Sequence, residues 1–387
     1  MEPAAMNPTA RILQLLPALG DGGVERSTVE MAAGLGARGI ANWVVSGGGD
    51  LVAAVEATGA RHVRLPVGAK SPFAIIANAR ALGRLIDAEA IDIVHARSRA
   101  PAWAGWLACR CFARRRCHFM TTFHGVYGHG NALKRFYNRV MLKGPLVVAN
   151  SQFIRAHIRD VYGYPDDRII VAARGVDPAL FDPAALPPDS RGTIRAEFGL
   201  ASDEALLIMV GRITGWKGHG VLVEALARLA DKPWRLVFAG SGNDGVITEL
   251  RQQIAALGLD QRIILAGSRR DVPALLAAAD LAFSASIEPE AFGRAAIEAE
   301  AMATPVIATD HGGSRETVRP GQTGWLVPPR DVDAMAAAIA EALSDRSRLI
   351  AMGEAGRAYV LENFTTARML AQELSAYERL LADDGAA

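Results

Sequence analysis

The sequence has 387 residues, of which 50% are hydrophobic and 21% are charged. This composition excludes a mainly disordered chain and a collagen-like chain, and the length predicts about two to three domains that each bury a core. No apolar run approaches the roughly 20 residues that cross a bilayer, and the first residues lack the pattern of a secretory signal. Three cysteines argue against a disulfide framework. We therefore expect a cytoplasmic protein.

The net charge of +1 conceals an asymmetry along the chain. Residues 1–176 contain 22 Lys and Arg against 12 Asp and Glu, a net charge of +10, and the remaining residues contain 20 against 29, a net charge of −9. Opposite signs indicate two modules with different partners, and a basic module favours an anionic surface or ligand. Solvated surface charge, with attraction between the two parts, explains the same pattern.

Strand-like and helix-like segments alternate through the first half. Strands are predicted at residues 11–16, 42–46, 62–65, 91–96, 118–123, 146–150 and 168–172. Helices are predicted at residues 24–39, 74–90 and 131–144, and a Gly-rich turn at residues 20–23 follows the first strand. This alternation is typical of stacked βα units with parallel strands.

The second half repeats this alternation after a proline-rich segment. Proline fixes φ and discourages regular structure, so residues 177–190 are predicted to be a linker. Strands are predicted at residues 205–212, 234–240, 262–267, 280–286 and 304–309, with a helix at residues 217–230 and two successive helices from about Ser344 to Leu381.

We therefore predict an α/β fold with two doubly wound, Rossmann-like parallel-sheet domains, residues 1–176 and residues 191–364. Ligands bind outside the carboxyl ends of such strands, so a cleft between the domains and a hinge at the linker are expected.

Two glutamates give the densest functional signal. Glu290 and Glu298 are eight residues apart, and in a helix they would lie on the order of 12 Å apart along the axis. That separation exceeds the roughly 5 to 9.5 Å of a two-carboxylate hydrolase, and it suits one carboxylate at each end of an extended ligand. Free amides at residues 291–293 would favour an anion at the start of such a helix. A helix cap at Glu290 and a solvated Glu298 are the alternative.

Two cations and one turn suggest a phosphate site. Arg212 and Lys217 follow a buried strand and precede a helix, and a guanidinium and an ammonium together can hold two phosphates. The pattern of a Walker loop is absent. Gly22 and Gly23 allow the backbone to approach a phosphate closely. Surface cations and an ordinary turn are the alternatives.

Together these segments resemble the retaining glycosyltransferases of family 4, also called group 1, which have the GT-B fold. The resemblance rests on the E-x-F-G-x(4)-E pattern from Glu290 to Glu298, on Arg212 with Lys217, and on the turn at Gly22 and Gly23. Further landmarks are Asn150-Ser151, Gly175-Val176-Asp177, and Gly312-Gly313 with Glu316. The sequence departs from some members of the family at Arg174, where Asn is usual.

The resemblance implies a role for each residue in binding the donor. Glu290 would bind hydroxyls of the donor sugar, and Glu298 would bind the ribose hydroxyls of the nucleotide. Arg212 and Lys217 would hold the diphosphate and stabilise the charge that grows as the sugar departs. The amides of Phe292 and Gly293, and the turn at Gly22 and Gly23, would share that charge. The loop from Ser268 to Val272 would contact the base.

The resemblance also implies how the parts are used. The first domain would bind the acceptor, the second would bind the donor, and the final helix, residues 365–387, would pack back on the first domain. His124 lies in a loop after a strand and would accept a hydrogen bond from a sugar hydroxyl as a neutral imidazole; a structural loop histidine is the alternative. Same-face attack, with the leaving phosphate helping to remove the acceptor proton, would retain the anomeric configuration.

No metal or other cofactor is expected. The spacing of Cys109, Cys111, Cys117 and His118 does not fit a zinc site. Asp331 and Asp333 imitate a metal-binding DxD, but they precede a helix, so capping explains them better. The two phosphate-binding cations make a divalent ion unnecessary.

Cations and aromatic residues are interleaved at residues 110–116 and 134–139. We expect these stretches to attach weakly and salt-sensitively to anionic lipid at the inner face of the membrane. A solvated basic face is the alternative, and nucleic acid is not expected as a partner because no nucleic-acid-binding motif is visible.

The predicted function is transfer of a sugar from a nucleotide-sugar donor to a glycan or lipid-linked acceptor. The process would be the synthesis of lipopolysaccharide, glycolipid or another cell-envelope glycan. A nucleotide-sugar 2-epimerase and a catalytically silent sugar-nucleotide-binding subunit are the alternatives. The sequence names neither the sugar, the base nor the acceptor.

Overall fold

The computed structural model describes residues 9–20 and 22–383. The chain divides into two compact units, one made of the residues up to Arg174 together with those from Ala367 onward, and the other of residues 175–366. Each unit is a parallel β-sheet covered by helices, which confirms the predicted α/β fold of two Rossmann-like domains. The two units are described separately below.

The N-terminal unit contains a seven-stranded sheet in the order β3-β2-β1-β4-β5-β6-β7. Its strands are β1 (Arg11–Leu15), β2 (Ala41–Ser46), β3 (Arg61–Arg64), β4 (Ile93–Ala96), β5 (His118–Phe123), β6 (Val147–Ala149) and β7 (Ile169–Val171). All pairs are parallel. The central strands are almost wholly buried, as expected of a parallel sheet with helices on both faces.

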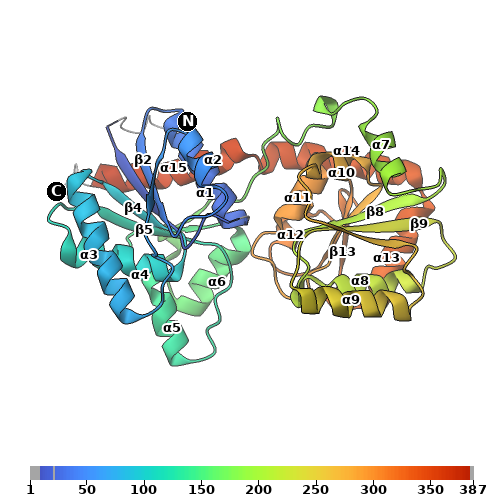
Figure 1. Cartoon of the computed structure of the whole chain (residues 1–387), viewed down its shortest axis with the longest axis horizontal. Helices are drawn as coiled ribbons and strands as arrows, with labels where there is room; N and C mark the ends of the chain where they lie inside the picture. Colours follow the sequence, from blue (N-terminus) through green and yellow to red (C-terminus); the bar gives the residue numbers. More distant parts are fainter. Residues whose placement is uncertain (1–8, 21, 384–387) are drawn as a thin grey trace. The chain divides into compact units, whose positions relative to one another are not determined.

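Helices cover both faces of this sheet (Figure 1). They are α1 (Gly23–Gly36), α2 (Val52–Ala57), α3 (Pro72–Ala88), α4 (Arg99–Leu107), α5 (Ala132–Asn138), α6 (Gln152–Tyr162) and α15 (Thr366–Asp383). The predicted helix at residues 131–144 is shorter than expected, because a 3-10 turn at Arg139–Leu142 continues α5.

The last helix belongs to the core of the N-terminal unit. Leu374, Tyr377 and Leu380 of α15 are buried with Ile12 of β1 and Met31 of α1. Figure 1 shows α15, in red, lying beside the blue helix α1. The N-terminal unit is therefore completed by residues from the far end of the chain.

The C-terminal unit contains a six-stranded parallel sheet in the order β10-β9-β8-β11-β12-β13. Its strands are β8 (Ala205–Val210), β9 (Trp234–Ala239), β10 (Ile263–Gly267), β11 (Leu281–Ser284), β12 (Val306–Thr309) and β13 (Gly324–Val327). The sequence analysis missed β13, which is four residues long and follows a turn.

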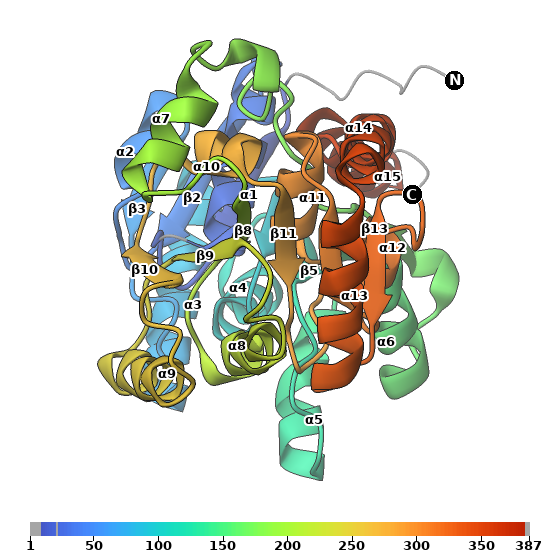
Figure 2. The same cartoon turned by 90° about the vertical axis from the view of Figure 1, so that its right-hand side faces the viewer.

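The helices of this unit are α7 (Ser190–Glu197), α8 (His219–Ala227), α9 (Asp244–Ala256), α10 (Val272–Ala278), α11 (Arg294–Ala301), α12 (Ser314–Thr317), α13 (Val332–Ser344) and α14 (Arg346–Asn363). Helices α8, α9 and α13 cover one face of the sheet, and α10, α11 and α14 cover the other (Figure 2). Asp331 caps α13 by accepting a hydrogen bond from the amide of Ala334 at 2.9 Å, as the sequence predicts.

The strand order reverses at one point in each sheet. In the N-terminal unit this point lies between β1 and β4, and in the C-terminal unit it lies between β8 and β11. Loops that leave neighbouring strands at such a point diverge and leave a crevice at the carboxyl edge of the sheet, where ligands of α/β proteins bind. The loops after these strands are therefore where a site is sought.

Candidate functional site

The loops that follow β8 and β11 bring Lys217 and Glu290 together. The ammonium of Lys217 forms an ion pair with a carboxylate oxygen of Glu290, although 73 residues separate them. Their side chains are 20% and 14% exposed, so both can still reach a ligand. Arg212 lies in the same loop as Lys217, is exposed, and makes no ion pair within residues 9–20 and 22–383. The loops after β8 and β11 thus bring two cations and one carboxylate to the edge of the sheet where the strand order reverses.

Tight backbone packing holds the two loops against each other. Gly218 has a φ of +78°, and a Cβ there would lie 1.9 Å from the carbonyl oxygen of Ala285, so no other residue fits. The amide of Ile287 donates to the carbonyl of Trp216 at 2.8 Å. The ammonium of Lys217 also lies 4.6 Å from the centre of the Trp216 ring, a cation–π contact.

Glu290 is fixed by its side chain and its backbone. The hydroxyl of Ser286 donates to Oε1 of Glu290 at 2.6 Å, the oxygen that Lys217 also contacts. The amide of Gly313, after β12, donates to the carbonyl of Glu290 at 2.8 Å. Gly312 has a φ of +58° and packs against the same carbonyl. The loops after two neighbouring strands therefore determine where this carboxylate lies.

The sequence predicts a mainly helical segment with Glu290 just before the helix; Glu290 does precede the helix, but the expectation of helix is wrong for residues 291–293. The helix α11 begins at Arg294, and its N-cap is Gly293 with a φ of +90°. A left-handed residue cannot continue a helix, so Glu290 lies in an extended loop before it. The ring of Phe292 is buried against Phe364, with 5.4 Å between ring centres. Only the backbone of Phe292 can therefore offer a hydrogen bond to a ligand.

Glu298 lies on the second turn of α11 and is largely buried. Nε of Arg294 donates to Oε1 of Glu298 at 3.0 Å, one helical turn away. Ser268 is exposed in the loop that follows β10, at the same edge of the sheet as the loops of Lys217 and Glu290. The neighbouring Arg269 is engaged by Glu197 and Asp271.

His219, at the start of α8 and close to Lys217 in the sequence, is strongly desolvated. The ring is buried at the start of α8, with 4.9 Å between its centre and that of Phe238. Burial, reinforced by the charge of Lys217, lowers the pKa of His219 to about 4. The ring is therefore neutral at physiological pH and adds no charge beside Lys217.

The N-terminal unit carries the remaining predicted residues. Gly22 is the N-cap of α1 and Gly23 is its first residue, after β1, whereas Asp21 of the same predicted turn lies outside the described residues. His124 directly follows β5, and the side-chain amide of Asn150 donates to its carbonyl at 3.5 Å. Burial, with the charge of Arg174 as the second cause, holds the pKa of His124 well below its usual range.

The other family landmarks have structural contacts. The hydroxyl of Ser151 accepts from the amide of Ile154 at 3.0 Å and caps α6. Val176 exchanges backbone hydrogen bonds with Phe364 and Thr366, where the chain leaves the C-terminal unit. The carbonyl of Glu316 accepts from the hydroxyl of Tyr359 at 2.8 Å.

Groups of three or more His, Cys, Asp or Glu side chains suited to a metal ion do not occur within residues 9–20 and 22–383. Cys111 is exposed, and Cys109 and Cys117 are half-buried free thiols. Asp333 pairs with Arg228.

No helix in the described part of the chain combines the length and apolar character that a bilayer crossing requires.

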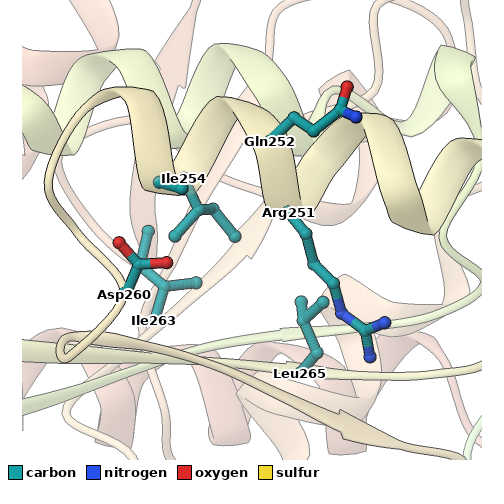
Figure 3. Close-up of a pocket in the computed structure, with 7 residues that line it drawn as sticks. Arg251, Gln252, Ile254, Asp260, Ile263 and Leu265 are labelled. Atoms are coloured by element: carbon teal, nitrogen blue, oxygen red, sulfur yellow. The ribbon is translucent and has the colours of Figure 1, made fainter.

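A separate hollow of about 520 Å³ lies between α9 and the edge strand β10 (Figure 3). Arg251 and Ile254 of α9 line it, together with Asp260, Ile263 and Leu265. None of the predicted site residues contributes to this hollow, and it holds only one acidic and one basic side chain. It is not the site assembled by Lys217 and Glu290.

Comparison with known proteins identifies the family. The family described as glycosyl transferases group 1 matches residues 190–359, and glycosyltransferase family 4 matches residues 21–180. The chain is 30% identical over 333 residues to a GDP-mannose-dependent α-(1-6)-phosphatidylinositol monomannoside mannosyltransferase of Mycolicibacterium smegmatis, covering 82% of this chain and 85% of that protein. The chain belongs to the group 1 glycosyltransferases of family 4.

Other relatives and solved structures agree with this family. A D-inositol 3-phosphate glycosyltransferase of Jonesia denitrificans is 32% identical over 74% of this chain and 72% of its own length. The crystal structure of a glycosyltransferase from Rickettsia africae superposes with a TM-score of 0.89 at 38% identity, covering 96% of this chain and 99% of that chain. HepE of Anabaena, solved with UDP and glucose, shares the GT-B fold at a TM-score of 0.81 and 24% identity, over 95% of this chain and 98% of its own.

The sequence analysis of this glycosyltransferase missed Ser286. The residue ends a predicted strand four positions before Glu290, and its hydroxyl shares Oε1 of Glu290 with Lys217. The position at the carboxyl end of a strand is a signal that could have identified it, because ligand-binding residues gather there. His311, whose Nε2 lies 2.8 Å from the carbonyl of Ser286, supports the same segment and was also missed.

Proposed function

We propose that this glycosyltransferase moves a sugar from a nucleotide-sugar donor to an acceptor hydroxyl and retains the anomeric configuration. The observation that carries the proposal is the contact between Lys217 and Glu290. Arg212 lies in the same loop as Lys217 and makes no ion pair with any residue that the structure describes. A diphosphate bears negative charge and its attached sugar bears hydroxyls. The two cations match the diphosphate, and the neighbouring carboxylate matches the hydroxyls of the sugar attached to it.

Arg212 and Lys217 are the proposed diphosphate ligands. As the sugar departs, negative charge grows on the phosphate, and fixed cations aimed at that charge are usually the largest catalytic contribution. Without donor, the carboxylate of Glu290 offsets the positive charge of Lys217. When the donor binds, its diphosphate becomes a second anion beside the same ammonium. Because two cations offset the phosphate charge, transfer is proposed to need no divalent ion and to continue in EDTA.

Glu290 is proposed to orient the sugar, and Glu298 the nucleotide. Oε1 of Glu290 already accepts from Ser286 and Lys217, which leaves the other oxygen for sugar hydroxyls. Glu298 would accept from the ribose hydroxyls, the amides of Phe292 and Gly293 would face the diphosphate, and the loop at Ser268 would contact the base.

The N-terminal unit is proposed to bind the acceptor and to contribute Gly22, Gly23 and His124. The acceptor hydroxyl would attack on the face from which the phosphate leaves, and that phosphate would take the acceptor proton. This route retains configuration without a protein nucleophile.

The relatives suggest the classes of donor and acceptor. A similar mycobacterial protein is named for GDP-mannose and a phosphatidylinositol mannoside, and HepE was solved with UDP-glucose. We propose a GDP- or UDP-linked hexose as donor and a lipid-linked or other cell-envelope glycan as acceptor, on the cytoplasmic side of the membrane.

Helix α5 is the proposed point of attachment to the membrane surface. Leu133 and Phe136 are 76% and 62% exposed, and Lys134, Arg135 and Arg139 lie beside them in the sequence. Exposed apolar side chains flanked by cations favour anionic bilayers, at about 1 kcal/mol per cation near the surface. Flotation with phosphatidylglycerol vesicles at low and high salt tests this, with the variant Leu133→Ser/Phe136→Ser as comparison; equal recovery in every sample contradicts it.

A panel of nucleotide sugars tests the function. Thermal unfolding with UDP, GDP and ADP sugars identifies the donor, because a ligand at 100 times its dissociation constant stabilises by about 2.7 kcal/mol. Transfer to glycolipid acceptors is then measured for wild type, Lys217→Ala and Glu290→Gln, and both variants are expected to lose it while remaining folded. Full activity in either folded variant refutes the role of that residue.

Two further incubations separate the alternatives. Donor alone, followed by chromatography, reveals an epimerase if a second nucleotide sugar appears. Binding without transfer or hydrolysis, over the whole acceptor panel, indicates a catalytically silent subunit.

A further inference from the structure

We infer that Arg174 is a positioning residue that fixes His124 as a hydrogen-bond donor through Nε2, and that this donor serves an oxygen of the bound sugar. The first part stands on contacts within the N-terminal unit. The second part rests on the proposed function, which supplies the sugar. Both residues belong to the same compact unit.

The proton on the imidazole follows from the chemistry of its neighbour. Nη2 of Arg174 contacts Nδ1 of His124. A guanidinium offers only N–H donors and has no lone pair to accept a hydrogen bond. Nδ1 must therefore accept, and the single proton of the neutral ring is on Nε2. This is the reverse of the sequence-based expectation, in which His124 accepts a hydrogen bond from a sugar hydroxyl.

Burial and three cationic or titratable neighbours keep the ring neutral. Burial is the largest influence on His124, and Arg174, Arg97 and His95 add to it, so the pKa is held well below its usual range. Protonation would also turn an N–H of the ring toward the N–H of Arg174. His124 is consequently a neutral donor at physiological pH.

The Nε2 atom of His124 is the ring nitrogen that can donate a hydrogen bond to a ligand. It is buried and has no hydrogen-bond partner in the described part of the chain. Buried N–H groups in folded proteins almost always have a partner, and leaving one unmade costs about 1–3 kcal/mol. A hydroxyl oxygen of the sugar is a suitable acceptor. Because Nε2–H has no lone pair, His124 cannot act as the base that removes the acceptor proton.

The C-terminal helix holds Arg174 in place. Arg174 is only 4% exposed, and its Nη1 lies 3.6 Å from Sδ of Met369 on α15. The same helix supplies Glu373, which pairs with Arg97 and offsets one of the two positive charges near the ring. An Asn, usual in the family at position 174, is shorter and offers both a donor and an acceptor, so it would not fix the proton in this way.

Nitrogen NMR on the wild-type protein decides the tautomer, and a variant is needed only to assign the His124 signals. Long-range ¹H–¹⁵N spectra of the full chain labelled with ¹⁵N-histidine distinguish a protonated from an unprotonated ring nitrogen, and the His124 signals are identified by their loss in His124→Gln. We expect Nε2 protonated and Nδ1 unprotonated from pH 6 to pH 8. A ring protonated at Nδ1, or one that titrates in this range, overturns the inference.

Variants test whether the positioning affects transfer. Arg174→Met keeps the length of the side chain and removes its donors, and Arg174→Lys keeps a charge and a donor; the exposed Arg168→Met is the control. We expect kcat/KM to fall about tenfold in Arg174→Met, as for one lost hydrogen bond, with partial recovery in Arg174→Lys and unchanged affinity for the nucleotide alone. In Arg174→Met the His124 spectrum should also show mixed tautomers.

The outcomes separate the inference from the proposed function. Wild-type protein that transfers no sugar from any donor refutes the proposed function, while the NMR result still decides the relation between Arg174 and His124. A folded Arg174→Met with wild-type kcat/KM and an unchanged spectrum overturns the inference and leaves the proposed function standing.

Discussion

Arg97 and Glu373 form a buried ion pair with two hydrogen bonds, although 276 residues separate them. The side chains are 0% and 1% exposed, and Gln14 of β1 accepts two further hydrogen bonds from the same guanidinium. Arg97 follows β4 at the strand-order reversal, and Glu373 lies on α15. The pair therefore joins the last helix of the chain to the centre of the N-terminal sheet.

Removing one partner should destabilise the N-terminal unit strongly. Glu373→Gln leaves the buried Arg97 charge uncompensated, which typically costs about 3–5 kcal/mol. We expect calorimetry at pH 7 to show a fall in unfolding temperature of roughly 2–4 °C for each kcal/mol. The exposed Glu362→Gln on α14 serves as control and should change little.

The pH dependence of stability gives a second test of the Arg97–Glu373 pair. The neighbouring Arg97 overcomes burial and lowers the pKa of Glu373 from 4.5 to about 2. The unfolded chain binds this proton first on acidification, so the stabilisation is complete above about pH 4.5 and disappears as the pH falls toward 2. Wild type and Glu373→Gln should therefore converge in acid; a constant difference would show that the carboxylate charge is not the cause.

Glu300 predicts the opposite pH dependence in the C-terminal unit. This residue of α11 is fully buried, and burial raises its pKa well above 4.5, opposed by the hydroxyl of Thr323. Above pH 4.5 the unfolded chain releases a proton that the native chain retains, so stability falls as the pH rises toward the raised pKa.

Glu300→Gln removes the loss of stability at high pH, because an amide does not ionise. We expect the variant to match wild type near pH 4 and to unfold at a higher temperature at pH 8, by about 1.4 kcal/mol for each unit between the two pKa values. Thermal unfolding at several pH values checks this, again with Glu362→Gln alongside. A variant that is less stable than wild type at pH 8 would disprove it.

The sequence was sufficient for most of the fold because buried parallel strands are visible as short apolar runs. Every strand from β1 to β12 coincides with a predicted segment, and only the short β13 was missed. The order of strands in each sheet has no such local signal. That order places the loops of Lys217 and Glu290 next to each other, and the sequence alone predicted them as separate signals.

Two features of the sites could not be predicted for a physical reason. The start of α11 depends on a left-handed Gly293, and glycine is compatible with both hands, so its presence does not reveal the conformation. The contact between Arg174 and His124 joins residues 50 positions apart. No periodicity in the sequence records a contact of this kind between two loops.

Ser286 should matter for the sugar and not for the nucleotide. Its hydroxyl donates to Oε1 of Glu290 at 2.6 Å, and a hydrogen bond to a charged group contributes about 1.5–3 kcal/mol. Ser286→Ala is expected to lower kcat/KM for transfer at least tenfold while the affinity for the free nucleoside diphosphate stays the same. The exposed Ser344→Ala is the control. Equal kinetics for the two variants would remove Ser286 from the site.

Gly312 and Gly321 provide a matched test of the loop that holds Glu290. Both have a positive φ, +58° and +75°, so an alanine at either position pays a conformational cost of roughly 1–2 kcal/mol. Only at Gly312 does the added Cβ also collide, at 2.4 Å from the carbonyl oxygen of Glu290; the space around Gly321 is open.

Gly312→Ala is therefore expected to displace Glu290, whereas Gly321→Ala should only reduce stability. Steady-state kinetics should show a loss of at least about tenfold in kcat/KM for Gly312→Ala and wild-type values for Gly321→Ala, since a small displacement of a positioning group is costly. Similar unfolding temperatures in the two variants would show that the activity difference does not come from stability. Equal activity in both would mean that the backbone of Glu290 tolerates displacement and that its carboxylate does not orient the sugar.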